Sequence, residues 1–217
     1  MEIDLLSKYP KPIRNVDKRV LEKNSEIVKT ARQFGKDFFD GDRKYGYGGF
    51  SYNPKYWTEV VKDFVSYYKL GPKAKVLDVG CAKGYMLYDF KREFKDIEVY
   101  GIDVSKYAID NCHPEVKDFL KVGNAKNIEF EDNYFDLVIS INTVHNLDLD
   151  DCIDSIKEIS RVSKSNSFIT VDAFNSEEEK KRMYKWNLTA KTIMSVSDWK
   201  KLFKEIDYYG DYYWFIP

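Results

Sequence analysis

From Lys75 onward, short apolar runs alternate with segments of helical periodicity, and this alternation constrains the fold more than any other feature. Strands that alternate with amphipathic helices favour a parallel sheet, because each connection between parallel strands crosses a face of the sheet. Strands are expected at Val76–Val79, Val99–Asp103, Phe119–Val122, Phe135–Ile141 and Phe168–Asp172. The sequence therefore predicts an α/β fold with a mostly parallel sheet and helices on both faces.

The segments between these strands have apolar residues at helical spacing. Helices are expected near Tyr85–Phe94, Lys106–Cys112 and Cys152–Val162. A last helix is expected to open at Ser197, whose hydroxyl suits an N-cap. The aromatic-rich residues 208–216 are expected to close the sheet as a final strand or a short hairpin.

The chain before the sheet differs in composition. Residues 14–40 are charged, and their apolar side chains recur at roughly helical intervals, which predicts one or two N-terminal helices. Residues 41–54 concentrate Gly, Tyr, Asn and Pro, a composition typical of a loop. An amphipathic helix then runs from Trp57 to Tyr68 and ends before Gly71.

Whole-chain composition limits the class of protein. With 217 residues, of which 43% are apolar, the chain suits one substantial core. Its formal charge of −1 lacks the field of a general nucleic-acid binder, and it has no run of ~18 apolar residues that would span a membrane. Three scattered cysteines form neither a CxxC pair nor a cluster with zinc-ligand spacing. We expect a cytoplasmic protein with reduced thiols and no metal, nucleic-acid or membrane partner; the oligomeric state stays open.

The first strand runs through Asp78 into the turn Gly80-Cys81-Ala82-Lys83-Gly84, which leads straight into a helix. In open α/β sheets, ligands bind at the carboxyl ends of the strands where the strand order reverses. Gly80 and Gly84 would let the backbone approach a ligand and would supply free N–H groups. A turn of this kind is also compatible with a purely packing role.

The next three strand ends add polar groups at the same edge. Asp103 ends the second strand, and its carboxylate could accept both hydroxyls of a ribose. The third strand ends in Asn124-Ala125, where the amide oxygen could accept from an adenine amine. The fourth strand includes Ser140 and leads to His145. Four consecutive strand ends thus offer a glycine turn, an acid, a base-recognising pair and a polar loop.

On these motifs, residues 72–174 resemble the class I S-adenosylmethionine (SAM)-dependent methyltransferase family. The resemblance implies a Rossmann-like fold, SAM as cofactor and S-adenosylhomocysteine as its product. In that family the first turn holds the methionine part of SAM, the acid binds the ribose, and the third-strand pair meets the adenine. We expect cofactor contacts from Asp78, Gly80, Cys81, Ala82, Gly84, Asp103, Val104, Asn124, Ala125, Ser140 and Tyr47.

Two departures from the family pattern are visible. Ala82 replaces the middle glycine of the usual GxGxG, and Asn124 replaces the usual aspartate of the third motif. Ala82 forbids only a strongly positive φ, and Asn124 keeps an acceptor oxygen, so both are compatible with SAM. The wider chain looks like a bacterial subfamily of small-molecule methyltransferases, which leaves the acceptor and the methylated atom unnamed.

Two alternatives compete with this interpretation. A dinucleotide oxidoreductase also has a glycine turn followed by an acid, but its GxGxxG fingerprint differs from Gly80-Cys81-Ala82-Lys83-Gly84-Tyr85. A non-catalytic SAM-binding sensor or accessory protein would share all of the motifs above.

His145 is the candidate catalytic residue, because it follows the fourth strand where the transferred methyl group is expected. A neutral imidazole could act as a general base towards the acceptor, and a structural histidine is an equal alternative. Asp172, at the end of the fifth strand, could face the acceptor or satisfy a neighbouring helix end.

An aromatic, glycine-rich stretch before the core is expected to act as a lid over the cofactor and to wall the acceptor site. It comprises Tyr45, Tyr47, Gly48, Gly49, Phe50 and Tyr52. The segment from Lys8 to Lys44 contains eleven Lys or Arg residues and six Asp or Glu residues, which gives a local charge of +5. This charge favours an anionic acceptor, such as a phosphate, a carboxylate or a nucleotide-linked sugar; a solvated helix face is the alternative.

We therefore divide the chain into two parts. Residues 1–55 form an N-terminal helical arm with an aromatic and glycine-rich lid, and residues 56–217 form the SAM-binding methyltransferase domain. A small-molecule acceptor is the expected partner.

Overall fold

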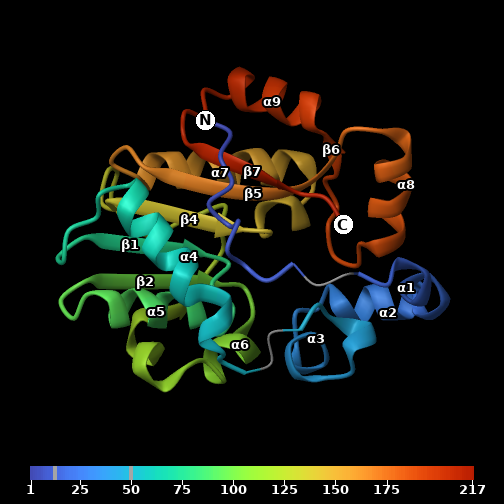
Figure 1. Ribbon diagram of the computed structural model, residues 1–217, viewed down its shortest axis with the longest axis horizontal. Helices are drawn as coiled ribbons and strands as arrows, with labels where there is room; N and C mark the ends of the chain where they lie inside the picture. The colour runs from blue at the N-terminus through green and yellow to red at the C-terminus, as the bar shows by residue number, and fades with distance from the viewer. Residues whose placement is uncertain (12–13, 49–50) are drawn as a thin grey trace.

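The computed structural model describes residues 1–11, 14–48 and 51–217, and its centre is one sheet of seven strands (Figure 1). The strands are β1 (Lys75–Val79), β2 (Glu98–Asp103), β3 (Leu120–Val122), β4 (Leu137–Ile141), β5 (Ser167–Phe174), β6 (Met194–Ser195) and β7 (Asp211–Phe215). Their order is β3-β2-β1-β4-β5, after which β6 and β7 both pair with β5. Every pairing between these strands is parallel, which confirms the predicted Rossmann-like α/β architecture.

Helices cover both faces of the sheet (Figure 1). On one face lie α4 (Pro54–Tyr67) and α5 (Tyr85–Glu93), and on the other lie α7 (Leu149–Val162) and α9 (Val196–Glu205). The neighbouring β1 residues Val76 and Leu77 are both fully buried, one in each of the two cores. This follows from the alternation of side chains along a strand, and it explains why β1 is apolar on both sides.

Several boundaries differ from the sequence-based expectation. Helix α6 (Lys106–Asp110) stops before Cys112 and is followed by the 3₁₀ helix η2 (Pro114–Phe119). Helix α7 begins three residues before Cys152, after Asp148. The N-cap of α9 is Ser195 rather than Ser197, since the Ser195 hydroxyl accepts from the backbone N–H of Asp198 at 3.1 Å.

The C-terminal part contains one helix that the periodicity did not reveal. Helix α8 (Glu177–Trp186) is almost entirely charged, and only Met183 and Trp186 are buried, so its apolar stripe is short. Together with α9 it provides the crossover that brings β7 parallel to β5. Residues 208–216 thus contain a final strand, and the hairpin alternative was wrong.

The N-terminal arm has three short helices, one more than expected. They are α1 (Val16–Glu22), α2 (Ser25–Ala31) and α3 (Lys36–Asp40), followed by the 3₁₀ helix η1 (Arg43–Tyr45). Asn24 separates the first two, because its side chain accepts from the N–H of Ile27 at 2.9 Å and so starts a new helix. Figure 1 shows the arm beside α8, at the carboxyl ends of the strands.

The first residues of the chain pack with the main domain. The N–H of Ile3 donates to the carbonyl of Tyr212 at 3.0 Å, and the N–H of Tyr212 donates to the carbonyl of Met1 at 3.0 Å. Leu5 is buried in the core formed with α4 and α5. The arm helices are therefore held at both ends by the main domain.

Candidate functional site

The turn after β1 has the backbone of a ligand-binding loop. Gly80 and Gly84 have φ of +86° and +71°, in the left-handed region that favours glycine. A Cβ on Gly80 would collide with the side chain of Thr143, and a Cβ on Gly84 would lie 2.7 Å from Leu120. Ala82 also has a positive φ, +49°, which costs an L-residue roughly 1–2 kcal/mol. The alanine thus adopts the left-handed conformation that the family's glycine would accept more readily.

The backbone N–H groups of the two glycines are not free. Gly80 donates to the carbonyl of Ile102 at 2.8 Å, and Gly84 donates to the carbonyl of Cys81 at 2.8 Å. The expectation of free donors at these positions was wrong, because the turn closes on β2 and on itself. The N–H groups of both glycines therefore have acceptors within the protein.

Asp103 is fixed by the same turn. Its Oδ2 accepts from the N–H of Ala82 and its Oδ1 from the N–H of Ser105, both at 2.8 Å. Burial raises the pKa of this carboxyl, and the two backbone hydrogen bonds partly offset the rise. Each oxygen keeps a second lone pair, so the carboxylate can still accept two ribose hydroxyls. The next side chain, Val104, is 64% exposed and offers an apolar surface for an adenine ring.

The third-strand pair is less open than expected. Asn124 is exposed, and its Oδ1 already accepts from the N–H of Lys126 at 3.0 Å, which leaves one lone pair for a base. Ala125 is partly buried and packs against the second core. This geometry allows the predicted contact with adenine but does not dedicate Asn124 to it.

Three of the expected cofactor ligands lie inside the protein. Ser140 is fully buried, and its hydroxyl donates to the carbonyl of Val79 at 3.0 Å, so it is a structural residue rather than a ligand. Cys81 is buried, and its N–H donates to Ile102. Asp78 is buried behind the turn, where desolvation and the charge of Asp103 raise its pKa to about 8.

The arm is fastened over this edge of the sheet. The Lys83 ammonium lies 2.5 Å from Asp40 of α3, and the Tyr107 hydroxyl donates to the same carboxylate at 2.8 Å. The Ser105 hydroxyl donates to the carbonyl of Phe34 at 2.5 Å. These contacts join the arm to the glycine turn and to the segment after Asp103, on both sides of the predicted cofactor.

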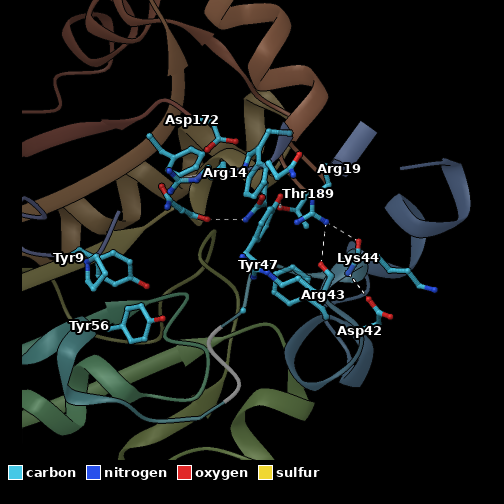
Figure 2. Close-up of a pocket in the computed structure, with 18 of the residues that line it drawn as sticks. Tyr9, Arg14, Arg19, Asp42, Arg43, Lys44, Tyr47, Tyr56, Asp172 and Thr189 are labelled. Carbon is cyan, nitrogen blue, oxygen red and sulfur yellow. Dashed lines mark hydrogen bonds between the residues drawn. The ribbon is translucent and has the colours of Figure 1, made fainter. Parts of the chain in front are cut away.

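A cavity of about 710 Å³ lies between the arm, α8 and the carboxyl ends of β4 and β5 (Figure 2). Its aromatic lining is Tyr9, Phe38, Tyr47, Tyr56, Trp57, Tyr85, Trp186 and Phe215. Its charged lining is Arg14, Lys18, Arg19, Arg43, Lys44, Glu22, Asp42 and Asp172. Basic side chains outnumber acidic ones in this lining.

Arg14 lines this cavity, and its guanidinium group forms no hydrogen bond or ion pair with the described residues. The guanidinium lies 4.4 Å from the ring centre of Phe215 and 5.7 Å from that of Trp186. Burial lowers its pKa, and no hydrogen bond or ion pair reaches the guanidinium from the residues that the structure describes. Tyr9 lies close by, and burial together with neighbouring Tyr56 raises its pKa to about 12.

Arg19 shows the opposite situation. It is buried, and its guanidinium donates to the carbonyls of Lys44 and Gly46, both at 3.0 Å. It also lies over the ring of Trp186 at 4.9 Å. Arg19 therefore holds the loop after α3 in place, and its charge is committed to the fold.

The predicted lid is only partly described by the structure. Gly49 and Phe50 lie outside the described residues. The Tyr47 hydroxyl accepts from the N–H of Leu188 at 2.8 Å and lies 3.3 Å from the Thr189 hydroxyl. Tyr47, which follows η1, thus lines the cavity and is hydrogen-bonded to the segment after α8. Tyr52 is tied to α5, since its hydroxyl donates to Asp89 at 2.8 Å.

His145 is held by Asp172 on both sides of its ring. It lies in the 3₁₀ helix η3 (Val144–Asn146) and is 3% exposed. Its Nδ1 accepts from the backbone N–H of Asp172 at 2.9 Å, and its Nε2 lies 3.7 Å from Asp172 Oδ1. Burial lowers its pKa, although Asp172 acts in the other direction. The lone pair of the neutral ring is therefore engaged, and this geometry does not suit the expected general base.

Two amide side chains, those of Asn146 and of Asn187 beside Asp172, were missed in the sequence. The Oδ1 of Asn146 is buried without a hydrogen-bond partner among the described residues, while its Nδ2 donates to the carbonyl of Asn142 at 3.1 Å. The Oδ2 of Asp172 accepts from Nδ2 of Asn187 at 2.5 Å. Arg14 was counted only as part of the basic arm, and nothing local distinguishes it from other arginines.

Two absences can be stated for residues 1–11, 14–48 and 51–217. No cluster of three or more His, Cys, Asp or Glu side chains is placed to hold a metal ion. No helix in that part of the chain is long and apolar enough to cross a membrane.

Comparison with known proteins finds one family model that covers more than half of the chain. A family model described as a methyltransferase domain matches residues 70–210. Phosphoethanolamine N-methyltransferase 3 of Arabidopsis thaliana is 32% identical over 135 residues, which cover 56% of this chain and 23% of the plant protein. Phosphoethanolamine N-methyltransferase 1 of the same plant is 30% identical over 131 residues, with the same coverage. The chain spans about a quarter of the length of these curated relatives.

Solved structures show the same fold at lower identity. The YcgJ protein from Bacillus subtilis superposes with a TM-score of 0.56 at 17% identity, over 67% of this chain and 66% of that one. A SAM-dependent methyltransferase from Archaeoglobus fulgidus gives 0.54 at 21% identity, over 69% and 66%.

Proposed function

Because the chain belongs to the methyltransferase-domain family, we propose that it transfers the methyl group of SAM to a small molecule carrying an anionic group. The family membership makes the chain a SAM-dependent enzyme, which disfavours the dinucleotide oxidoreductase and the non-catalytic sensor. Beyond the family, we propose the chemical class of the acceptor.

The observation that supports an anionic acceptor is the guanidinium of Arg14. It is half-buried against Phe215 and has no partner among the described residues. Asp172 acts on this charge only from a distance, without forming an ion pair, and an arriving phosphate or carboxylate could pair with the guanidinium directly. The five N–H donors of a guanidinium suit the planar or bidentate recognition of such groups.

Neighbouring side chains extend this anion site. Arg43 lines the same cavity, and burial lowers its pKa while Tyr56 and Tyr9 act in the other direction. Figure 2 shows the hydroxyl ends of Tyr9 and Tyr56 directed into the cavity. Two guanidinium groups and two phenol hydroxyls thus surround one region of the cavity, a combination that suits an oxyanion.

The relatives suggest which anion to test first. Both plant proteins are named for phosphoethanolamine, which has a phosphate at one end and an amine at the other. A molecule of this size fits within about 710 Å³, and the cavity extends from Arg14 to His145 and Asn146. We therefore infer that phosphoalkylamines are the leading acceptors, ahead of simple carboxylates and nucleotide-linked sugars.

The roles of the residues follow from their positions. SAM, when bound, supplies an electrophilic methyl group on a sulfonium. The turn from Gly80 to Gly84 leaves space for its methionine part, and Asp103 accepts its ribose hydroxyls. Arg14 holds the anionic end of the acceptor and thereby aligns the other end with the methyl group. Alignment and exclusion of water under the arm provide the rate enhancement.

A methyl-transfer assay with phosphoethanolamine and ethanolamine tests this proposal. The two molecules share the amine and differ in the phosphate, so the first should have a kcat/KM higher by ~10²-fold, as expected for charge-assisted hydrogen bonds. Equal rates with both would contradict the anion site. Calorimetry with S-adenosylhomocysteine and with NAD provides the control, and only the former should bind.

A further inference from the structure

Asp172 lies at the carboxyl end of β5, in the wall of the cavity and next to His145. We propose that Asp172, positioned by Asn187, accepts the proton that an amine acceptor loses, and that His145 serves as a fixed hydrogen-bond donor. This inference rests on the proposed function, since it assigns the proton step within the same cavity.

The histidine is excluded as the base by its own hydrogen bonds. A neutral imidazole has one lone pair, and at His145 that lone pair is on Nδ1, which accepts from the N–H of Asp172. The ring proton is therefore on Nε2, directed toward Asp172 Oδ1 at 3.7 Å. A ring in this tautomer can donate toward a carboxylate, but it has no free nitrogen with which to take a proton.

Asp172 has one oxygen held and one oxygen available. Its Oδ2 accepts from Asn187 at 2.5 Å, and its backbone carbonyl accepts from the indole N–H of Trp199 at 3.0 Å. No hydrogen bond from the described residues reaches Oδ1, which is the oxygen nearest to His145 Nε2. The carboxylate is thus fixed in orientation while one oxygen remains able to receive a proton.

The surroundings of Asp172 favour a carboxyl that takes up protons. Burial raises its pKa, while His145, Asn187 and Arg14 act in the opposite direction. Tyr47 lines the same cavity, and burial raises the pKa of its phenol, with a smaller contribution in the same direction from the negative charge of Asp172. A base with a pKa closer to the working pH is more effective than an exposed aspartate.

The chemical step balances with these groups alone. An alkylammonium is protonated at neutral pH and has no lone pair, so one N–H bond must break while an O–H bond forms on Asp172. The free amine then forms the N–C bond as the C–S bond of SAM breaks, which leaves neutral S-adenosylhomocysteine and a methylated ammonium. Asp172 later releases its proton to solvent. The unpartnered Oδ1 of Asn146 can accept a second N–H of the same amine.

Substitutions separate the two residues kinetically, with phosphoethanolamine as the probe. Asp172→Asn keeps the shape, and kcat should fall by ~10²-fold or more with loss of the acidic limb of the pH–rate profile. His145→Gln retains a donor near Nε2 but loses the exact placement of the ring, so kcat should fall by roughly fivefold while the acidic limb persists. The affinity for S-adenosylhomocysteine should stay unchanged in both, which also reports that they fold. Wild-type turnover in Asp172→Asn, or a large loss in His145→Gln, overturns the assignment.

Asn187→Ala provides the test of positioning. Loss of its hydrogen bond removes an interaction that favours the charged carboxyl, so the acidic limb should shift to higher pH. An unchanged limb would mean that Asn187 does not act through Asp172.

A nuclear magnetic resonance measurement of the His145 ring tests its assigned tautomer without any acceptor. The chain has only two histidines, so ¹⁵N labelling of histidine in the S-adenosylhomocysteine complex resolves His145 from His113. His145 should stay in the neutral Nε2–H tautomer from about pH 6 to about pH 8. If it titrates in this range or protonates at Nδ1, the inference fails. If phosphoethanolamine is not methylated, the proposed function fails separately.

Discussion

The predicted cofactor edge and the cavity differ in how far their polar groups are hydrogen-bonded within the protein. At the predicted cofactor edge, Gly80, Gly84 and Asp103 each form hydrogen bonds with backbone groups of β2, of the turn or of the segment after β2. In the acceptor cavity, the guanidinium of Arg14 and the Oδ1 of Asn146 have no partner among the described residues. The polar groups of the first region have hydrogen-bond partners within the protein. The two polar groups of the second region have none among the described residues.

This contrast separates stability from specificity. Groups that satisfy one another contribute to folding, so substitutions of Gly80 or of Asp103 should weaken the fold together with cofactor binding. Groups left unpartnered contribute little to folding and much to binding, so substitutions in the cavity should change acceptor use alone. Four substitutions test the contrast.

The largest effect is expected from Gly80→Ala. The new Cβ would meet the side chain of Thr143 at a backbone with φ of +86°, and strain plus overpacking should cost about 2–5 kcal/mol of unfolding free energy. Urea denaturation measures this loss. Gly71→Ala is the matched control, because nothing lies within 4 Å of the added Cβ. Equal stability of the two variants would show that the turn tolerates a side chain.

Asp78→Asn should change the pH dependence of stability. The pKa of Asp78 is raised to about 8, so between its ordinary value of 3.8 and about 8 the folded chain holds more protons than the unfolded chain. The stability that this group contributes is therefore present at low pH and is lost as pH rises through that window. The free energy of unfolding of the variant should rise relative to that of wild type by up to ~1.4 kcal/mol per pH unit between about pH 6 and about pH 8.

Thermal unfolding at the two pH values measures the difference. Asp96→Asn, at an exposed position of the same domain, is the control and should leave the pH dependence as in wild type. Parallel curves for Asp78→Asn and wild type would mean that the carboxyl is ionised throughout.

Arg14→Gln tests the acceptor half. Loss of charge-assisted hydrogen bonds should raise the KM for phosphoethanolamine about tenfold, ~1.4 kcal/mol, with unchanged unfolding free energy and unchanged affinity for S-adenosylhomocysteine. Lys29→Gln removes the same charge from the arm at an exposed position outside the cavity, and its KM should stay near wild type. A similar rise in both variants would indicate long-range charge rather than a defined anion site.

Asp40→Asn should give the smallest effect. Hydrogen bonds from Lys83 and Tyr107 hold the pKa of Asp40 below its usual value despite the opposing effect of burial. Loss of the charge should cost ~0.5–1 kcal/mol and speed hydrogen exchange in α3 a few-fold, with little change elsewhere. Asp37→Asn in the same helix is the control. Unchanged exchange in α3 would show that other contacts hold the arm.

Local patterns predicted the fold and the position of the glycine turn. The alternation after Lys75 predicted the parallel sheet and its two covered faces, and the strand–glycine–helix pattern located the turn at Gly80 to Gly84. Both depend on residues adjacent in the chain, whose periodicity and backbone conformation are set by side-chain size and direction. The predicted helix ends were less accurate where two nearby residues could each serve as the N-cap, as Ser195 and Ser197 could for α9.

The acceptor half was decided by tertiary structure alone. Arg14 meets Phe215, and His145 meets Asp172, across long separations in sequence, so no periodicity or spacing connects them. The tautomer of His145, the buried position of Ser140 and the parallel placement of β7 depend on which groups packing brings together. Hydrogen bonding and desolvation are set by those neighbours. The sequence by itself determined the parallel α/β fold and the glycine turn, and the folded chain decided which side chains line the cavity and which of them are hydrogen-bonded within the protein.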